Sequence, residues 1–313
     1  MRPDVIVICG PTASGKTALA AALARELGGE VVSADSMQVY RRMDIGTAKP
    51  TAEEMGDVPH HMIDVADPEE NYSVARYVQE AIPVVDGILA RGRVPIVAGG
   101  TGLYIDNLIA GRQFAPFPAE SGLREELQAR ARREGLAALA AELAQVDPET
   151  AARLHPNDEK RIIRALEVWQ ATGRTLSQHD RESRAVPPRY AALTIGLDFA
   201  DRADLRARID RRVDEMMERG LEEEVRGLLA GGLSPGCTAM QAIGYKEFTD
   251  VLDGRCTVEA AADQVRQSSR RYAKRQLTWF RRNERIHWLR RGPEAADAEI
   301  LTAARRILQE NDS

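Results

Sequence analysis

The sequence predicts an α/β fold: a parallel sheet with helices on both faces, plus an inserted all-helical subdomain. The first observation is that short runs rich in Val and Ile alternate with helical periodicity, at 4–9, 30–34, 62–65 and 93–98. Such runs are typical of buried parallel strands, and their alternation with helices indicates repeated strand–helix–strand units. The second observation is that no strand pattern occurs between about residue 115 and residue 190.

The core is expected to comprise residues 1–114 and 191–313, interrupted by the helical insertion at 115–190. Two later runs, at 192–199 and 285–290, should add strands to the same sheet. Helical periodicity in the core predicts helices at four places, 16–27, 73–91, 201–230 and 257–284.

The pattern of the insertion predicts helices separated by turns, at 123–146, 148–154 and 158–173. Asn157 and Asp158 offer side chains that can cap the third of these helices. Gly173 is a typical helix stop.

The composition is that of a globular protein without a membrane anchor. Of 313 residues, 43% are hydrophobic and 29% charged, and no apolar run approaches the roughly 18 residues that span a bilayer. The first residues lack the pattern of a signal peptide, so we expect a cytoplasmic protein with no membrane partner. Cys9, Cys237 and Cys256 lie far apart, which indicates reduced thiols rather than a disulfide framework or a zinc module.

A basic segment at 266–291 stands out against a formal net charge of −5. It contains ten Lys or Arg and one acid, Glu284, for a local charge of +9 that leaves −14 on the rest of the chain. Charge runs are common on solvated helix faces, so charge alone leaves that alternative open. Four interleaved aromatic residues favour a surface that contacts phosphates and bases: Tyr272, Trp279, Phe280 and Trp288.

A glycine-rich motif follows the first expected strand and precedes the first expected helix. It fits G-x-x-x-x-G-K-[ST] and consists of Gly10, Pro11, Thr12, Ala13, Ser14, Gly15, Lys16 and Thr17. In this context, backbone N–H groups converge on phosphate oxygens at the positive end of the helix. Lys16 would neutralise a terminal or leaving phosphate, and Thr17 would offer its hydroxyl to magnesium. The motif therefore predicts a P-loop NTPase-like fold that holds a diphosphate or triphosphate together with Mg²⁺.

Asp35 follows the strand expected at 30–34. It should lie beside the P-loop, in the crevice at the carboxyl edge where doubly wound sheets bind ligands. Spacing alone does not separate a magnesium ligand from a general base, and a helix cap or turn is the structural alternative.

Gly99, Gly100, Thr101 and Gly102 follow the strand expected at 93–98 and should reach the same crevice. Glycines permit close approach to a ligand, and Thr101 can hydrogen-bond one, although a glycine-rich connection with no ligand would show the same pattern. Because this strand does not end in an acid, a motor-type ATPase is disfavoured.

Seven motifs occur in order along nearly the whole chain: GPTASGKT (10–17), SADSMQVYRRMDIGTAKP (33–50), PHHMIDVADP (59–68), VAGGTGLY (97–104), HPNDEKRIIRALEV (155–168), QAIGYKE (241–247) and AKRQLTWFRR (273–282). Together they resemble the tRNA dimethylallyltransferase family in its bacterial form. Members of this family transfer an isopentenyl group to the N6 amine of the adenine next to the anticodon. Met37 departs from the Arg or Ala that the family often has after Asp-Ser.

The resemblance implies that the P-loop holds the diphosphate of dimethylallyl diphosphate rather than ATP. Lys16, Thr17 and either Arg208 or Arg212 would stabilise the leaving diphosphate, with Mg²⁺ as the cofactor. Asp35 would be the general base, in a catalytic site that also includes Thr101. A carboxylate is too weak a base to deprotonate the amine before attack, so proton transfer would accompany C–N bond formation. The enzyme would act as a monomer on position 37 of tRNAs that read codons beginning with U.

The resemblance also implies contacts with the tRNA anticodon stem-loop, whose single-stranded loop lets the target base leave its stack at least cost. The positions are Asp35, Ser36, Met37 and Gln38; Thr101; Glu159, Lys160, Arg161, Ile162 and Ile163; Gln241, Ala242, Ile243, Gly244, Tyr245 and Lys246; and Lys274, Arg275, Gln276, Leu277, Thr278, Trp279, Phe280 and Arg281. On the helix after Asp158, we also expect Arg164 to face phosphates with Lys160 and Arg161. Ile163, Leu166 and Val168 should pack inward.

Two other functions fit part of the pattern. A P-loop nucleotide or small-molecule kinase would share the sheet, the cradle and the nearby Asp35, but would not need the basic aromatic segment. A non-catalytic, nucleotide-gated RNA-binding module would need that segment but not Asp35.

Overall fold

The computed structural model describes residues 3–112, 114, 122–292 and 296–311, with backbone alone at 183–185. The chain divides into two compact units, Met1–Gln113 with Arg189–Ser313, and Phe114–Pro188. Each unit has its own hydrophobic core and is described by itself.

The first unit is built on a six-stranded sheet in the order β3-β2-β4-β1-β5-β6, and every pairing is parallel. The strands are β1 (Val5–Cys9), β2 (Glu30–Ser33), β3 (His60–His61), β4 (Pro95–Gly99), β5 (Ala192–Phe199) and β6 (His287–Arg291). Because consecutive side chains of a strand point to opposite faces, Val5 and Val7 join one core while Ile6 and Ile8 join another. The predicted α/β fold with a parallel sheet is confirmed.

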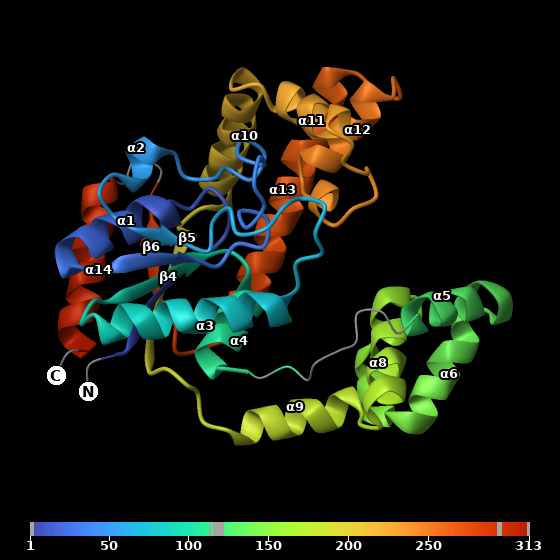
Figure 1. The fold of residues 1–313 in the computed structure, drawn as a ribbon. Helices are drawn as coiled ribbons and strands as arrows, with labels where there is room; N and C mark the ends of the chain where they lie inside the picture. The colour runs from blue at the N-terminus through green and yellow to red at the C-terminus, as the bar shows by residue number, and fades with distance from the viewer. Residues whose placement is uncertain (1–2, 113, 115–121, 293–295, 312–313) are drawn as a thin grey trace. The chain divides into compact units, whose positions relative to one another are not determined.

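Helices cover both faces of this sheet (Figure 1). On the face of Ile6 and Ile8, α1 (Lys16–Leu27) and α14 (Asp297–Asn311) contact each other and contribute Leu23 and Ile300 to the core. On the opposite face, α3 (Val74–Ala90) packs against α4 (Gly102–Ala110). The short helix α2 (Ala52–Met55) begins with a capping box at Thr51.

Four further helices of the first unit lie together in Figure 1: α10 (Arg202–Glu218), α11 (Leu221–Ala230), α12 (Tyr245–Leu252) and α13 (Val258–Phe280). A 3-10 turn at Ala239–Gln241 precedes α12. The long helix α13 packs against α10 and α12, and α10 also contacts β5. This arrangement brings α10 and α13 over the P-loop, because Ala13 shares a buried cluster with Ile209 of α10 and Leu277 of α13.

The second unit contains α5 (Leu123–Glu134), α6 (Leu136–Val146), α7 (Pro148–Arg153), α8 (Glu159–Thr172) and α9 (Leu176–Ala185). Asp158 caps α8 by accepting a hydrogen bond from the backbone N–H of Arg161 at 3.3 Å, and Gly173 ends the helix at a φ of 70°. Ile163, Leu166 and Val168 are buried as expected. The part of the insertion at 115–121 lies outside the described residues.

Several boundaries differ from the sequence prediction. The strand expected at 62–65 is instead β3 at His60–His61, because Met62 and Asp64 have φ values of 61° and 56°, which an extended strand cannot contain. The helix expected at 201–230 is two helices that break at Gly220, whose φ is 90°. The helix expected at 123–146 likewise breaks at Gly135. Among the described residues, no helix is both long and apolar enough to cross a membrane.

Candidate active site

The P-loop links β1 to α1 with the backbone geometry that its glycines permit. Gly15 is the N-cap of α1 at a φ of 89°, and Ala13 is also held in the left-handed region at 61°. Lys16 Nζ donates a hydrogen bond to the carbonyl oxygen of Pro11 at 2.6 Å. Ser14 Oγ is buried and has no hydrogen-bond partner in the described residues. These features form a cradle of polar groups at the positive end of a helix.

Two arginines of α10 lie against this cradle. Arg208 Nε donates to the carbonyl oxygen of Ala13 at 3.1 Å, and Arg212 Nη1 donates to Thr12 Oγ1 at 3.4 Å. Arg212 Nη2 also reaches the carbonyl oxygen of Ala48 at 3.4 Å. The sequence left open which arginine would meet the diphosphate; in the structure, Arg212 lines the same cavity as Lys16, and Arg208 lines an adjoining one.

Burial and mutual repulsion change the acidity of these cations. Burial, followed by the positive charge of Arg212, lowers the pKa of Lys16 from 10.5 to about 8, although Asp35 opposes the effect. Burial likewise lowers the pKa of Arg212. The cradle therefore holds positive charge that is short of solvent and of counter-ions, a condition that a bound anion would relieve.

A buried arginine supports the P-loop from the sheet. Arg291 is the last residue of β6 and is 4% exposed. Its Nη1 donates to the carbonyl oxygen of Ser14 at 3.3 Å, and its Nη2 pairs with Asp297 of α14 at 2.9 Å. The geometry of the P-loop thus depends on the last strand and the last helix.

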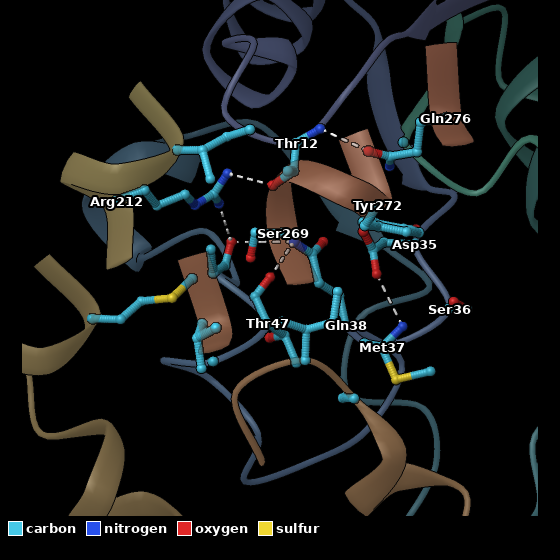
Figure 2. Close-up of a pocket in the computed structure, with 18 of the residues that line it drawn as sticks. Thr12, Asp35, Ser36, Met37, Gln38, Thr47, Arg212, Ser269, Tyr272 and Gln276 are labelled. Atoms are coloured by element: carbon cyan, nitrogen blue, oxygen red, sulfur yellow. Dashed lines mark hydrogen bonds between the residues drawn. The ribbon is translucent and has the colours of Figure 1, made fainter. Parts of the chain in front are cut away.

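One cavity of about 320 Å³ is lined by Lys16, Thr17 and Asp35. The P-loop and the loop at residues 35–38, here called the acidic loop, therefore border the same cavity, as Thr12 and Asp35 show in Figure 2. Asp35 follows β2, and its Oδ1 accepts a hydrogen bond from the backbone N–H of Met37 at 2.9 Å. This bond orients the carboxylate, and Figure 2 shows it beside Tyr272 of α13. Burial and the charge of Asp35 raise the pKa of Tyr272, so its phenol is neutral.

Thr101 supports the acidic loop from the neighbouring strand. Its Oγ1 accepts a hydrogen bond from the backbone N–H of Ser36 at 3.0 Å and donates one to Ser36 Oγ at 3.3 Å. The backbone N–H of Thr101 also donates to the carbonyl oxygen of Ala34 at 3.1 Å. The two loops that the sequence placed in one crevice are therefore joined through Thr101.

Comparisons with known proteins agree on one family. The model of the IPP transferase family matches residues 38–283. The tRNA dimethylallyltransferase of Geobacter sulfurreducens is 52% identical over 289 residues, 92% of each chain. That of Desulforudis audaxviator is 51% identical over 304 residues, which cover 96% of this chain and 97% of that one. This chain belongs to the tRNA dimethylallyltransferase family.

Solved structures of this family have the same fold. The tRNA isopentenylpyrophosphate transferase of Bacillus halodurans matches with a TM-score of 0.72 at 45% identity, over 98% of this chain and 97% of that one. A eukaryotic dimethylallyltransferase described as acting on tRNA matches with a TM-score of 0.81 at 28% identity, over 98% of this chain and 79% of that one. The kinase alternative finds no support in these comparisons.

Part of the cavity lining in this member of the dimethylallyltransferase family is apolar, which the sequence analysis did not anticipate. Ile209, Val213 and Met216 of α10 and Val265 of α13 line the cavity. The spacing of the first three along one helix is the available sequence signal. It was not informative by itself, because residues with this spacing usually pack in a core.

A polar loop closes another side of the cavity. Gly46, Thr47 and Ala48 line it, and Gln38 Nε2 donates to the carbonyl oxygens of Thr47 and Ala48 at 3.3 and 3.1 Å. Glu224 of α11 holds the start of this loop by accepting backbone hydrogen bonds, including one from Gly46 at 3.2 Å. No local pattern marks Glu224 for this role, because its partners lie far away in the sequence.

The positions that the family resemblance assigns to RNA contact differ in exposure, and those of the acidic loop, together with Thr101 and Ile243, are half-buried: Asp35, Ser36, Met37 and Gln38. Ile162, Ile163, Tyr245, Leu277 and Phe280 have side chains packed in the interior, away from the cavity, whereas Ala242 and Gln276 are buried but line the cavity. The exposed positions are Glu159, Lys160, Arg161, Gln241, Lys246, Lys274, Arg275, Thr278 and Arg281. Trp279 is half-buried, and its Nε1 donates to Asp106 Oδ2 at 2.9 Å, which commits the indole to α4 rather than to a base.

The basic segment is less basic in the structure than in the sequence. Arg266 and Arg270 pair with Asp214 and Asp210 of α10, and Arg281 and Arg291 pair with Asp198 and Asp297. Six residues make no ion pair within the described part of the chain: Arg271, Lys274, Arg275, Arg282, Arg285 and Arg290. These six carry the net positive charge of the segment.

Proposed function

We propose that this chain transfers a dimethylallyl group from dimethylallyl diphosphate to N6 of the adenine at position 37 of tRNAs that read codons beginning with U, releasing diphosphate. The observation that carries the proposal is that Lys16 and Asp35 line one cavity. We expect the enzyme to act in the cytoplasm as a monomer.

The donor end of the cavity, which comprises Arg212 and three P-loop residues, Thr12, Lys16 and Thr17, suits a diphosphate. Lys16 and Arg212 are two cations with lowered pKa values. Elsewhere in the P-loop, Ser14 Oγ is buried and has no hydrogen-bond partner among the described residues. As the bond from the allylic carbon to diphosphate breaks, negative charge grows on the leaving oxygens. Fixed cations and backbone N–H groups stabilise that charge without reorganising.

The cradle also fits a magnesium ion. The described residues contain no cluster of three His, Cys, Asp or Glu side chains that could hold a metal, but Thr17 lies in the cavity beside Lys16. Mg²⁺ commonly takes one or two protein ligands and completes its shell with substrate phosphates and water. Thr17 would supply the protein ligand, and the ion would neutralise part of the diphosphate charge.

The acceptor end of the cavity, which comprises Asp35, Ser36 and Gln38, suits the adenine. The N6–carbon bond forms while the carbon–oxygen bond to diphosphate breaks, so N6 becomes acidic only as the reaction proceeds. The carboxylate of Asp35, oriented by the N–H of Met37, then accepts the N6 proton. The apolar side chains of Ile209, Val213 and Met216 would hold the prenyl chain between the two ends. They would also keep water away from the allylic carbon, which carries partial positive charge in the transition state.

The anticodon stem-loop would approach along the exposed basic residues of α13. Lys274 and Arg275 are exposed and make no ion pair in the described residues, and Arg275 also lines the cavity. Phosphate contacts of this kind fix the register of an RNA without reading its sequence. In the second unit, Lys160 is better placed than Arg161 to bind an RNA phosphate, because Arg161 already forms an ion pair with Asp158.

The experiment is to incubate the protein with unmodified tRNA, Mg²⁺ and dimethylallyl diphosphate, digest the RNA and weigh the nucleosides. A gain of one isopentenyl unit on adenosine supports the proposal. ATP replaces the donor in a parallel reaction, where phosphate transfer would favour a kinase. Binding of tRNA with no mass change in either reaction would favour the RNA-binding module.

A further inference from the structure

Gln276 is a buried polar residue on the helix whose opposite side is basic and exposed. Its side chain is 5% exposed, whereas Lys274 and Arg275 on the same helix are exposed. Its amide makes two hydrogen bonds: Oε1 accepts from the backbone N–H of Thr12 at 2.9 Å, and Nε2 donates to the carbonyl oxygen of Gly100 at 3.0 Å. Figure 2 shows the first of these bonds, between the labelled residues Thr12 and Gln276.

The two backbone groups that Gln276 holds belong to loops with different tasks. Thr12 is part of the P-loop, and its hydroxyl also accepts from Arg212. Gly100 precedes Thr101, whose Oγ1 accepts from the backbone N–H of Ser36, the residue next to Asp35. One side chain thus connects the donor end of the cavity to the loop that supports the acceptor end.

The fit at this junction requires both an amide and a glycine. A carboxylate could accept from Thr12 but could not donate to Gly100, and an aliphatic side chain could do neither. A Cβ atom at position 100 would lie 2.1 Å from Gln276 Nε2, so Gly100 leaves the space that the amide enters. A backbone N–H in a partly buried position is costly to leave without a partner, so this contact helps to fix the position of the P-loop together with the contacts of Arg208 and Arg291.

We propose that Gln276, which lines the cavity, is a positioning residue: by joining the P-loop to the loop at Gly100 it acts as a clamp that sets the separation of the two reactants. This inference rests on the proposed function for its kinetic consequence. Prenyl transfer requires N6 and the allylic carbon to be aligned, and a misplacement of about 1 Å can cost about 100-fold in rate. Loss of the clamp would therefore slow the chemical step without weakening the grip on either substrate.

Three variants test the clamp. Gln276→Leu removes both hydrogen bonds at similar volume, and Gln276→Glu keeps only the acceptor for Thr12. The control, Gln264→Leu, makes the same change at an exposed position of the same helix. We expect Gln276→Leu to lower kcat by about 100-fold, with the KM for dimethylallyl diphosphate and the Kd for tRNA changed by less than about threefold. Gln276→Glu should fall between it and the wild type.

A second measurement does not depend on turnover. Hydrogen exchange followed by mass spectrometry should show faster exchange in the peptide that contains Thr12 for Gln276→Leu, and unchanged exchange for the control. If the wild type transfers no prenyl group, the proposed function fails, and the exchange result still decides whether the clamp exists. A variant with unchanged kcat would overturn the inference, and so would a tRNA affinity that falls while kcat holds, because the latter is the behaviour of an RNA contact.

Discussion

At the donor end of the cavity, the groups that would face the ligand are crowded cations, whereas at the acceptor end a single carboxylate is held by neutral hydrogen bonds. Burial, together with the nearby positive charge of Arg212, lowers the pKa of Lys16. Asp35 is instead oriented by a backbone N–H, and its loop is tied to Thr101. The difference teaches that an anion bound at the donor end would relieve the repulsion between its cations. The hydrogen bonds at the acceptor end instead orient the carboxylate toward the substrate and add little to substrate affinity.

The largest effect should come from removing the base at the acceptor end. Asp35→Asn keeps the shape of the side chain but cannot accept the N6 proton, so kcat should fall by about 1,000-fold. Binding of diphosphate and of tRNA should stay close to the wild type. Turnover is followed by nucleoside mass spectrometry, and binding by calorimetry. Loss of diphosphate binding would instead assign Asp35 to the metal.

The matching change at the donor end should separate binding from stability. Lys16→Met removes a cation that stabilises the leaving diphosphate, so kcat/KM for the donor should fall by about 100-fold. The melting temperature should not fall, because the substitution also removes a half-buried charge that repels Arg212. A lower melting temperature with unchanged kcat/KM would contradict the charge-crowding picture.

The pH dependence of donor binding should be smaller and should follow Lys16. Its pKa of about 8 means that the ammonium is charged below that pH and neutral above it. The KM for dimethylallyl diphosphate should therefore rise as pH increases beyond 8, by up to about tenfold per pH unit. In Lys16→Arg, whose guanidinium stays charged, this rise should be absent. Binding of tRNA to the wild type over the same range controls for general loss of structure.

The smallest effect should come from single contacts on the exposed side of α13. Lys274→Ala should weaken tRNA binding a few-fold and reduce the slope of log K against log salt by about 1. Arg266→Ala is the matched control, because Arg266 is already neutralised by Asp214 and Asp263. Equal losses in the two variants would mean that the position of the charge on the helix does not matter.

Local signals predicted most of the sheet and the P-loop, because strand patterns and the glycine motif depend on neighbouring residues. Where local conformation departed from pattern, the prediction was wrong: the apolar run at 62–65 is not a strand, since Met62 and Asp64 are left-handed. The break at Gly220 was visible as a glycine, but a single glycine inside a helical pattern does not decide the outcome.

The long-range part of the site could not be predicted. Gln276 and Thr12 lie 264 positions apart, and nothing local marks the amide as a clamp rather than as a polar side chain for RNA. The sequence of the basic segment likewise could not show which of its cations are paired, since Asp210 and Asp214 come from another helix. Local sequence motifs identified the residue types of the site. Contacts with distant parts of the chain determined which of those side chains are free to bind a ligand.

Through the contact of Arg291 with Ser14, strand β6 supports the P-loop that would bind the diphosphate. A shortened chain that ended before β6 would keep every motif for RNA and for the prenyl donor, yet it would lose the guanidinium beneath the P-loop. Such a truncation should spare the affinity for RNA and abolish the grip on diphosphate. In this protein, a strand near residue 291 completes a cradle whose motif lies at residues 10–17.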